Sequence, residues 1–300
     1  MWRSRRSSFS SAGSAATCSI ATERDASCGC RSTGEARGAG GNVTADRGIR
    51  AILFDLDGTL YDERGAMRAA LAVTTAEATR TIPGFDAAIA CRLYEEIGRG
   101  IWEKADLSGS GPLPPPSSME LRQRVWGALL ERLGVTEAGA GERLAARYAR
   151  ARSAGHVLFP EAAGVLERLL VLSRSGDSFK VGLVSNGASD LQREKLDNCG
   201  LSSLLEPILI SSEVGWVKPE PEIFLEGVRQ CGCLPEEALF VGDSLERDIS
   251  GARAAGLRAV WVNRSGEDRL PGAWAAEFVL RDLTPLPEIV ACDRGATGRS

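Results

Sequence analysis

Short apolar segments alternate with amphipathic helical segments along the second half of the chain, and this alternation limits the possible folds most strongly. Apolar segments typical of buried strands occupy residues 179–187, 207–211, 238–244 and 258–263. Helical patterns separate these segments, at residues 188–198, 221–231 and 246–255. Strands that alternate with helices predict an α/β fold, in which helices cover both faces of a mostly parallel, Rossmann-like sheet.

One more strand is expected upstream, and it ends in two acidic residues. In the segment ILFDLDGTLYDE (residues 52–63), an apolar run gives way to Asp55 and Asp57. Side chains alternate along a strand, so both carboxylates point to the same side. At contact range the two charges repel by about 1 to 4 kcal/mol, depending on the local dielectric. Either a cation or a shared proton must offset this repulsion.

Polar residues also follow two other expected strands. Ser185 and Asn186 end the strand that starts at residue 179, and Asp243 ends the strand that starts at residue 238. In open parallel sheets, ligands bind and functional residues lie at the carboxyl ends of the strands. The sequence therefore predicts that the two upstream aspartates lie beside Asp243.

Residues 64 to about 155, which separate the first two strands, are predicted to be helical. Apolar residues recur every four positions in two sets: Ile89, Leu93, Ile97 and Ile101, and then Leu121, Val125, Leu129 and Leu133. Ser117 and Glu120 have the spacing of a capping box, and the proline-rich segment 108–118 predicts a loop between the two sets. Trp102 and Trp126 are expected to belong to the apolar core of these helices, and the alternative is that either one faces the cleft.

The first 48 residues differ in composition from the rest of the chain. They are rich in Ser, Gly, Ala and Arg and show no periodic apolar pattern, which predicts a disordered low-complexity tail. Arg3, Arg5 and Arg6 occur in a stretch of 22 residues without an acid, as in organellar transit peptides. A start codon assigned too far upstream would give the same pattern. The expected location is the cytoplasm, or a chloroplast or mitochondrion if the segment is a transit peptide.

Charge and hydropathy argue against two classes of partner. The net charge is −4, although residues 1–50 hold eight Arg and only four acids, so the remaining chain is markedly acidic. A nucleic-acid-binding face would normally be basic, so no nucleic acid is expected as a partner. The chain has no run of 18 apolar residues, so no membrane association is expected either.

Four short motifs carry a resemblance to a known family. DLDGT (55–59), VSNG (184–187), KPEPEIF (218–224) and GDSLERD (242–248) resemble the four motifs of the haloacid dehalogenase (HAD) superfamily, in its order and spacing. The resemblance covers about residues 50 to 265. It implies a core formed by residues 49–63 and 156–290, with residues 64–155 as a mobile helical cap.

The resemblance also implies a role for each matching residue. Asp55 would be the nucleophile that forms an aspartyl-phosphate, and Asp57 would be the general acid and base. Ser185 would donate a hydrogen bond to the phosphoryl group, while Lys218 would supply positive charge and hold Asp55 ionised. The residues expected to bind substrate are Gly58, Thr59, Asn186 and Gly187. The expected ligands of Mg²⁺, a cation that prefers oxygen donors, are Asp55, Asp243, Asp248 and the Asp57 carbonyl.

Several reactions occur in families with these motifs. HAD dehalogenases lack an acid two residues after the nucleophile and need no metal, so Asp57 and Asp243 favour phosphate chemistry. We expect a Mg²⁺-dependent phosphomonoesterase that acts on a small phosphorylated metabolite. It looks like the branch with phosphoglycolate phosphatases, N-acylneuraminate-9-phosphatases and nucleotidases. The alternatives are a phosphotransferase of the hexose-phosphate mutase kind and a non-catalytic phosphate-binding relative.

Overall fold

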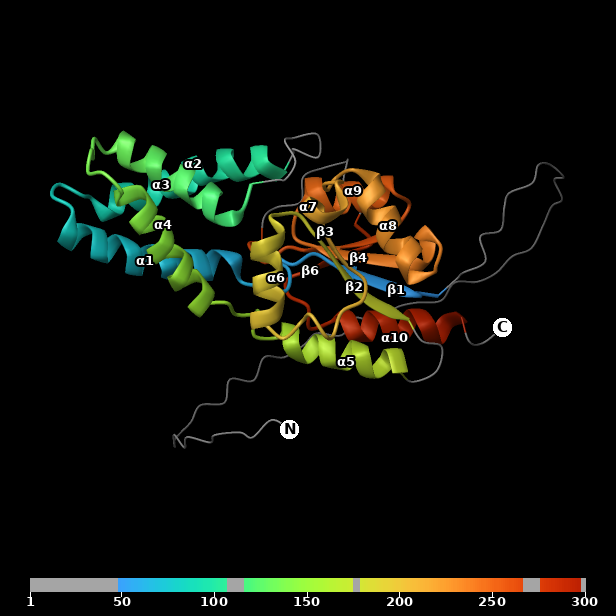
Figure 1. Cartoon of the computed structure of the whole chain (residues 1–300). Coiled ribbons are helices and arrows are strands. Elements are labelled where there is room, and N and C mark those ends of the chain that lie inside the picture. Colours follow the sequence, from blue (N-terminus) through green and yellow to red (C-terminus); the bar gives the residue numbers. More distant parts are fainter. Residues whose placement is uncertain (1–47, 107–115, 175–178, 267–275, 298–300) are drawn as a thin grey trace, which may run out of the picture. The chain divides into compact units, whose positions relative to one another are not determined.

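A computed structural model describes residues 48–106, 116–174, 179–266 and 276–297 (Figure 1). The expected tail, apart from Gly48, lies outside the described residues, as does most of the proline-rich segment 108–118. Predictions about the tail, including its possible role in targeting, therefore stay predictions.

The core of the fold is a six-stranded parallel sheet. Its strands are β1 (Ala51–Phe54), β2 (Lys180–Ser185), β3 (Ile208–Ile210), β4 (Ala238–Gly242), β5 (Arg258–Val262) and β6 (Phe278–Leu280). Their order across the sheet is β3-β2-β1-β4-β5-β6, and every pair is parallel. The predicted α/β, Rossmann-like fold is confirmed. The sequence did not indicate β6, because three residues are too few to show a strand periodicity.

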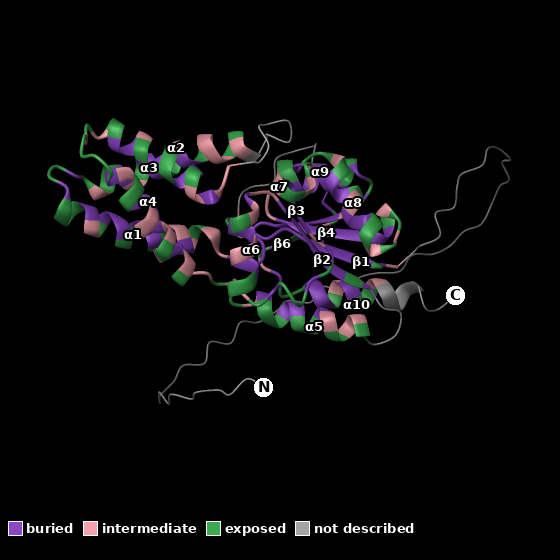
Figure 2. Cartoon of the chain, in the orientation of Figure 1, coloured by how far each residue is buried: buried purple, intermediate pink, exposed green. Residues whose placement is uncertain are grey.

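Side chains that alternate along the strands fill two separate apolar layers. Ile52 and Phe54 of β1 lie in one layer, together with helices α5 (Ala162–Arg174) and α10 (Leu286–Thr297). Ala51 and Leu53 lie in the other layer, with α8 (Pro221–Cys231) and α9 (Gly251–Ala254). Burial is continuous along the central strands (Figure 2). The near-continuous apolar strands of the sequence reflect this burial on both faces.

Within the described residues, four helices lie between β1 and α5, and we call them the helical insert. They are α1 (Glu63–Thr81), α2 (Ala87–Asp106), α3 (Ser118–Arg132) and α4 (Ala140–Ala154). The insert has an apolar core of its own, which contains Tyr94, Trp126 and Tyr148. The capping box predicted at Ser117 is present at the start of α3. Ile89, expected on the apolar side of its helix, is instead 39% exposed.

The segment after β4 departs from the expected single helix at 246–255. Residues Leu245–Ser250 form a π-helical turn, η2, and α9 follows it. The Ile249 amide bonds to the Ser244 carbonyl five residues back (3.1 Å), and the Asp248 carboxylate accepts a hydrogen bond from the Ser244 amide (2.9 Å). π-Helical turns are rare and occur frequently at functional sites. This turn carries Asp248.

The remaining short elements connect the strands. They are α6 (Ser189–Asn198), α7 (Ser211–Val214) and the 3₁₀ turn η1 (Pro235–Glu237). None of the helices within the described ranges is long and apolar enough to cross a membrane.

Candidate active site

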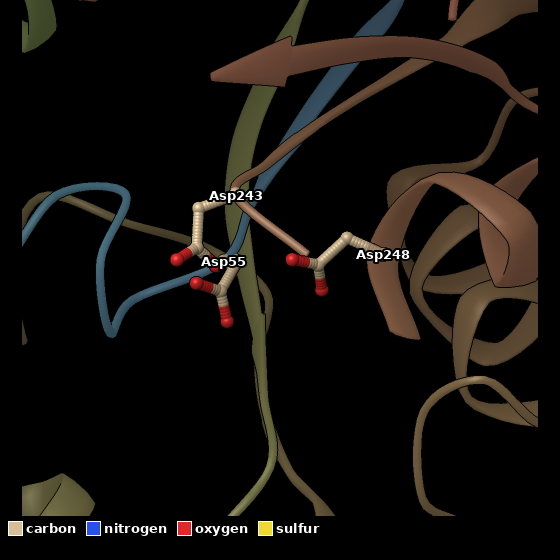
Figure 3. A group of neighbouring side chains, drawn as sticks. All are labelled: Asp55, Asp243 and Asp248. Atoms are coloured by element: carbon tan, nitrogen blue, oxygen red, sulfur yellow. The ribbon is translucent and has the colours of Figure 1, made fainter. Parts of the chain in front are cut away.

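The register of the three central strands brings the acidic residues together. Phe54 pairs with Leu183 of β2 and with Val241 of β4, so the chain leaves all three strands at the same edge. Asp55 follows Phe54 directly, and its amide bonds to the Val241 carbonyl (2.9 Å). Carboxylate oxygens of Asp55, Asp243 and Asp248 all lie within 4.8 Å of one another. Figure 3 shows these three side chains converging from β1, from the end of β4 and from η2.

A buried lysine joins two of the three carboxylates. Lys218 Nζ donates to Asp55 Oδ1 (2.6 Å) and to Asp248 Oδ1 (2.7 Å). Burial opposes the charge of this lysine, but the two carboxylates outweigh burial and raise its pKa above the usual value. Burial raises the pKa of Asp55 to about 6, although Lys218 works against this shift. The second Asp55 oxygen accepts a hydrogen bond from the Thr59 hydroxyl (3.0 Å), so both oxygens have a fixed direction.

Asn186 holds the backbone of Lys218 in place. Its side-chain amide donates to the Lys218 carbonyl (3.0 Å), and its side-chain oxygen accepts from the Lys218 amide (2.9 Å). These two bonds tie the end of β2 to the loop before α8. The Asn186 side chain is therefore used for positioning Lys218.

Asp57 is held by a different set of residues, which come from α6. Lys195 Nζ lies 2.7 and 2.8 Å from the two Asp57 oxygens, and Gln192 Nε2 donates to Asp57 Oδ2 (3.0 Å). Gln192 also donates to the Ser185 hydroxyl (2.5 Å). On its other side, Lys195 lies 3.2 Å from Glu63, which pairs with Arg152 at 2.6 Å. The two aspartates of the DLD segment thus each contact a buried lysine of their own.

Asp243 lacks such a partner. No lysine or arginine of the described residues lies within ion-pair distance of its carboxylate. Burial, together with the charges of Asp55 and Asp248, raises the pKa of Asp243 to about 8. A divalent cation would relieve this accumulation of buried negative charge, and clustered carboxylate oxygens are the donors that Mg²⁺ prefers. The residues present therefore fit a metal, because carboxylate oxygens of Asp55, Asp243 and Asp248 gather at one place.

Gly58 permits the close approach of the DLD segment to Asp243. Its φ angle is +87°, and a Cβ atom at this position would lie 2.2 Å from Asp243 Oδ2. Any larger residue would displace the Asp243 carboxylate.

A cavity of about 490 Å³ connects these groups with the helical insert. The catalytic candidates that line it are Asp55, Asp57, Lys218, Asp243 and Asp248, together with Asn186 and Gly187. Tyr94, Trp102 and Tyr148 line it from the insert, so for Trp102 the alternative of a position facing the cleft is the one observed. Trp126 is fully buried, as expected.

Three expected site residues do not line this cavity. Thr59 is fully buried and bonds to Asp55, while Ser185 is 1% exposed and bonds to Gln192. Gly58 lines a second cavity, which Asp243 also lines. The contacts with substrate expected for these residues stay predictions.

Sequence reasoning missed Lys195 and Gln192. Both are buried on the face of α6 that also buries Leu191 and Leu196. Their spacing was the available signal, because they occupy positions that the helical period assigns to the apolar face. A polar side chain buried there needs a polar partner. Asp248 also gains a role, since its two oxygens accept hydrogen bonds from Lys218 and from the Ser244 amide.

A comparison with protein families identifies the same kind of protein. The family model of haloacid dehalogenase-like hydrolases matches residues 49–256 of the sequence. The chain belongs to this family. The resemblance drawn from the four motifs is thereby confirmed, and so is the assignment to the hydrolases.

Individual HAD proteins are similar over most of the chain. A phosphoserine phosphatase from Thermus thermophilus is 36% identical over 72% of this chain and 89% of its own length. The N-acylneuraminate-9-phosphatase of Mus musculus is 28% identical over 81% of this chain and 94% of its own. A crystal structure of the HAD-hydrolase YfnB from Bacillus subtilis, bound to magnesium, is 28% identical with a TM-score of 0.63. It covers 81% of this chain and 99% of that chain.

Proposed function

We propose that this HAD hydrolase is a Mg²⁺-dependent phosphomonoesterase that acts through an aspartyl-phosphate on Asp55. The observation that carries the proposal is the pair of ion pairs Asp55–Lys218 and Asp57–Lys195 at the edge of one cavity. Asp55 and Asp57 are thus held by different lysines, which suits a nucleophile and a separate acid–base. The relatives named as phosphatases support the same reaction class.

In the first step, an Asp55 oxygen attacks phosphorus, a new O–P bond forms, and the ester P–O bond breaks. Lys218 and Thr59 hold the nucleophile in a fixed orientation through bonds to its two oxygens. Such positioning lowers the entropic cost of reaching the transition state. The buried Lys218 charge, 2.6 Å from the nucleophile, would also stabilise the negative charge that develops on the phosphoryl group.

Asp57 would move the protons. Its proton goes to the leaving alkoxide in the first step, and in the second step it takes a proton from the water that hydrolyses the aspartyl-phosphate. Lys195 and Gln192 fix its carboxylate at the cavity edge, where its side chain is 29% exposed. This partial exposure gives Asp57 access to the leaving group and to water.

Asp55 and Asp243 would hold the metal, with the Asp57 carbonyl and Asp248 as further expected ligands. When bound, Mg²⁺ would neutralise charge on the transferring phosphoryl group and offset the repulsion among the carboxylates. Asp248 would meanwhile keep Lys218 directed at the reacting centre.

We further propose that the helical insert, taken as residues 64–155, is a cap over a core of residues 49–63 and 156–290. Insert side chains line the same cavity as the catalytic acids, so the insert would select the substrate and exclude water. The cavity suits a small phosphorylated metabolite. The relatives act on compounds of this size, phosphoserine and N-acylneuraminate 9-phosphate among them.

The test is a screen of phosphorylated metabolites and p-nitrophenyl phosphate against the purified protein. Phosphate release should require Mg²⁺ and stop when EDTA is added. Asp55→Asn, which keeps the shape of the side chain, serves as the control for contaminating phosphatases. Equal phosphate release by this variant, or full turnover in EDTA, would contradict the proposal.

A further inference from the structure

The buried basic side chains of this protein, within the described residues, are Arg122, Arg152, Lys195 and Lys218. Three of them have carboxylate partners: Arg152 pairs with Glu63, Lys195 with Asp57, and Lys218 with Asp55. Arg122 is the exception. It is 4% exposed, yet none of the described carboxylates lies within ion-pair distance of its guanidinium.

Arg122 lines the same cavity as the catalytic acids. A buried charge is costly unless it is paired and hydrogen-bonded, and an arginine cannot lose its proton to escape this cost. Because the guanidinium faces a cavity open to ligands, the missing partner can be supplied by a bound molecule. The planar fork of an arginine matches an oxyanion through two parallel hydrogen bonds.

The walls around Arg122 suit a defined acidic group. Tyr94 and Tyr148 are buried in the same cavity, with ring centroids 4.8 Å apart. Four exposed arginines also line the cavity, and water screens their charges: Arg64, Arg68, Arg99 and Arg247. One buried guanidinium balances one negative charge. A carboxylate carries that charge, whereas a second phosphate carries nearly two near neutral pH.

We propose that the substrate is a phosphorylated carboxylic acid, whose carboxylate binds Arg122 while its phosphate lies at Asp55. This inference rests on the proposed phosphatase function and adds a substrate class to it. Arg122 is then a specificity residue, and it has no part in phosphoryl transfer itself.

The first test compares substrates that differ only in the acid. The purified protein with Mg²⁺ is given 3-phosphoglycerate or glycerol 3-phosphate, in which a hydroxymethyl group replaces the carboxylate. O-Phosphoserine and O-phosphoethanolamine form a second matched pair. We expect kcat/KM to be about 10²-fold higher for each acid, the range of hydrogen bonds to a charged group. A ratio near one in both pairs would overturn the inference, as would a clear preference for 1,3-propanediol bisphosphate.

The second test removes the guanidinium. Arg122→Met should bring the ratio of kcat/KM between acid and analogue toward one in each pair. Arg122→Lys should retain part of this ratio, because lysine keeps the positive charge but cannot form two parallel hydrogen bonds. Arg124→Met is the matched control: Arg124 lies on the same helix but is exposed and does not line the cavity. It should keep the full ratio. If Arg122→Met and Arg122→Lys both fold and keep the full ratio, the assignment is wrong.

Binding separates this inference from the proposed reaction. Calorimetry on the Asp55→Asn protein should find tighter binding of 3-phosphoglycerate than of glycerol 3-phosphate. The difference should be lost when Arg122→Met is added. This measurement needs no turnover, so it decides the carboxylate assignment even if the screen finds no hydrolysis. Equal binding of the two compounds would refute the assignment while leaving the phosphatase proposal intact.

Discussion

Lys195 Nζ lies 2.7 Å from Asp57 Oδ1 and 2.8 Å from Asp57 Oδ2, so the ammonium spans both oxygens of the proposed acid–base. The lysine is itself 2% exposed and comes from α6, far from Asp57 in the sequence. These contacts fix the orientation of the Asp57 carboxylate at the cavity that it lines. Lys195 is therefore a positioning residue for Asp57.

Lys195→Met should lower kcat by about 10²-fold, the effect expected when a catalytic group is misplaced by about an ångström. The loss should be larger for alkyl phosphates, which need the proton, than for p-nitrophenyl phosphate, which does not. Lys180→Met is the control, since Lys180 is exposed on β2. An equal loss on both kinds of ester would mean that Lys195 supports the fold and not the proton transfer.

Gly58→Ala should weaken Mg²⁺ binding through Asp243. The new Cβ would collide with Asp243 Oδ2, and the left-handed backbone of Gly58 adds strain. We expect the Mg²⁺ concentration at half-maximal activity to rise at least about 10-fold. Gly84→Ala is the matched control, because Gly84 has a φ of +74° with nothing within 4 Å of the added atom. Backbone strain should cost each variant about 1 kcal/mol of unfolding free energy or more, and the collision should add to the loss in Gly58→Ala. An equal Mg²⁺ requirement in the two would contradict the prediction.

Glu63 should make stability depend on pH in the acid range. Burial raises its pKa, but Lys195 and Arg152 outweigh burial and lower it from 4.5 to about 2. A lowered folded-state pKa stabilises the protein above the unfolded value, and this contribution is lost as the pH falls from about 4.5 toward 2. Glu63→Gln should thus cost about 1 to 2 kcal/mol at pH 7, a value discounted for solvent screening. By urea unfolding, the difference from wild type should shrink by about half between pH 5 and pH 3. A constant difference would contradict this account.

Much of the fold could be predicted from the sequence, because the patterns that indicate it involve residues close together in the chain. The alternation of apolar and helical segments predicted the parallel sheet, and the strand ends predicted where the acids gather. The capping box at Ser117 likewise needs only neighbouring residues. The π-helical turn at Leu245–Ser250 was not predictable from periodicity, and it is accompanied by a hydrogen bond that the Ser244 amide donates to the Asp248 carboxylate.

The parts of the site that escaped prediction depend on distant contacts. Lys195 meets Asp57 across 138 positions of sequence, and Arg152 meets Glu63 across 89. Neither pair belongs to a motif, and a charged residue on a helix is normally solvated. Arg122 was not predictable from the sequence either. Its proposed role depends on its burial without a carboxylate at ion-pair distance, and only the packing of the insert shows this.

The most direct measurement of the central claim is the site of the phosphoryl group in a trapped intermediate. Asp57→Asn should form the aspartyl-phosphate from p-nitrophenyl phosphate and hydrolyse it slowly, because general base catalysis is worth about 10² to 10⁴ in rate. A burst of p-nitrophenolate should precede a slow steady rate. Mass spectrometry of the acid-quenched, digested protein should place one phosphoryl group on Asp55, and Asp55→Asn should show neither burst nor phosphoryl group. A phosphoryl group on any other residue, or turnover by Asp55→Asn at the wild-type rate, would contradict the account.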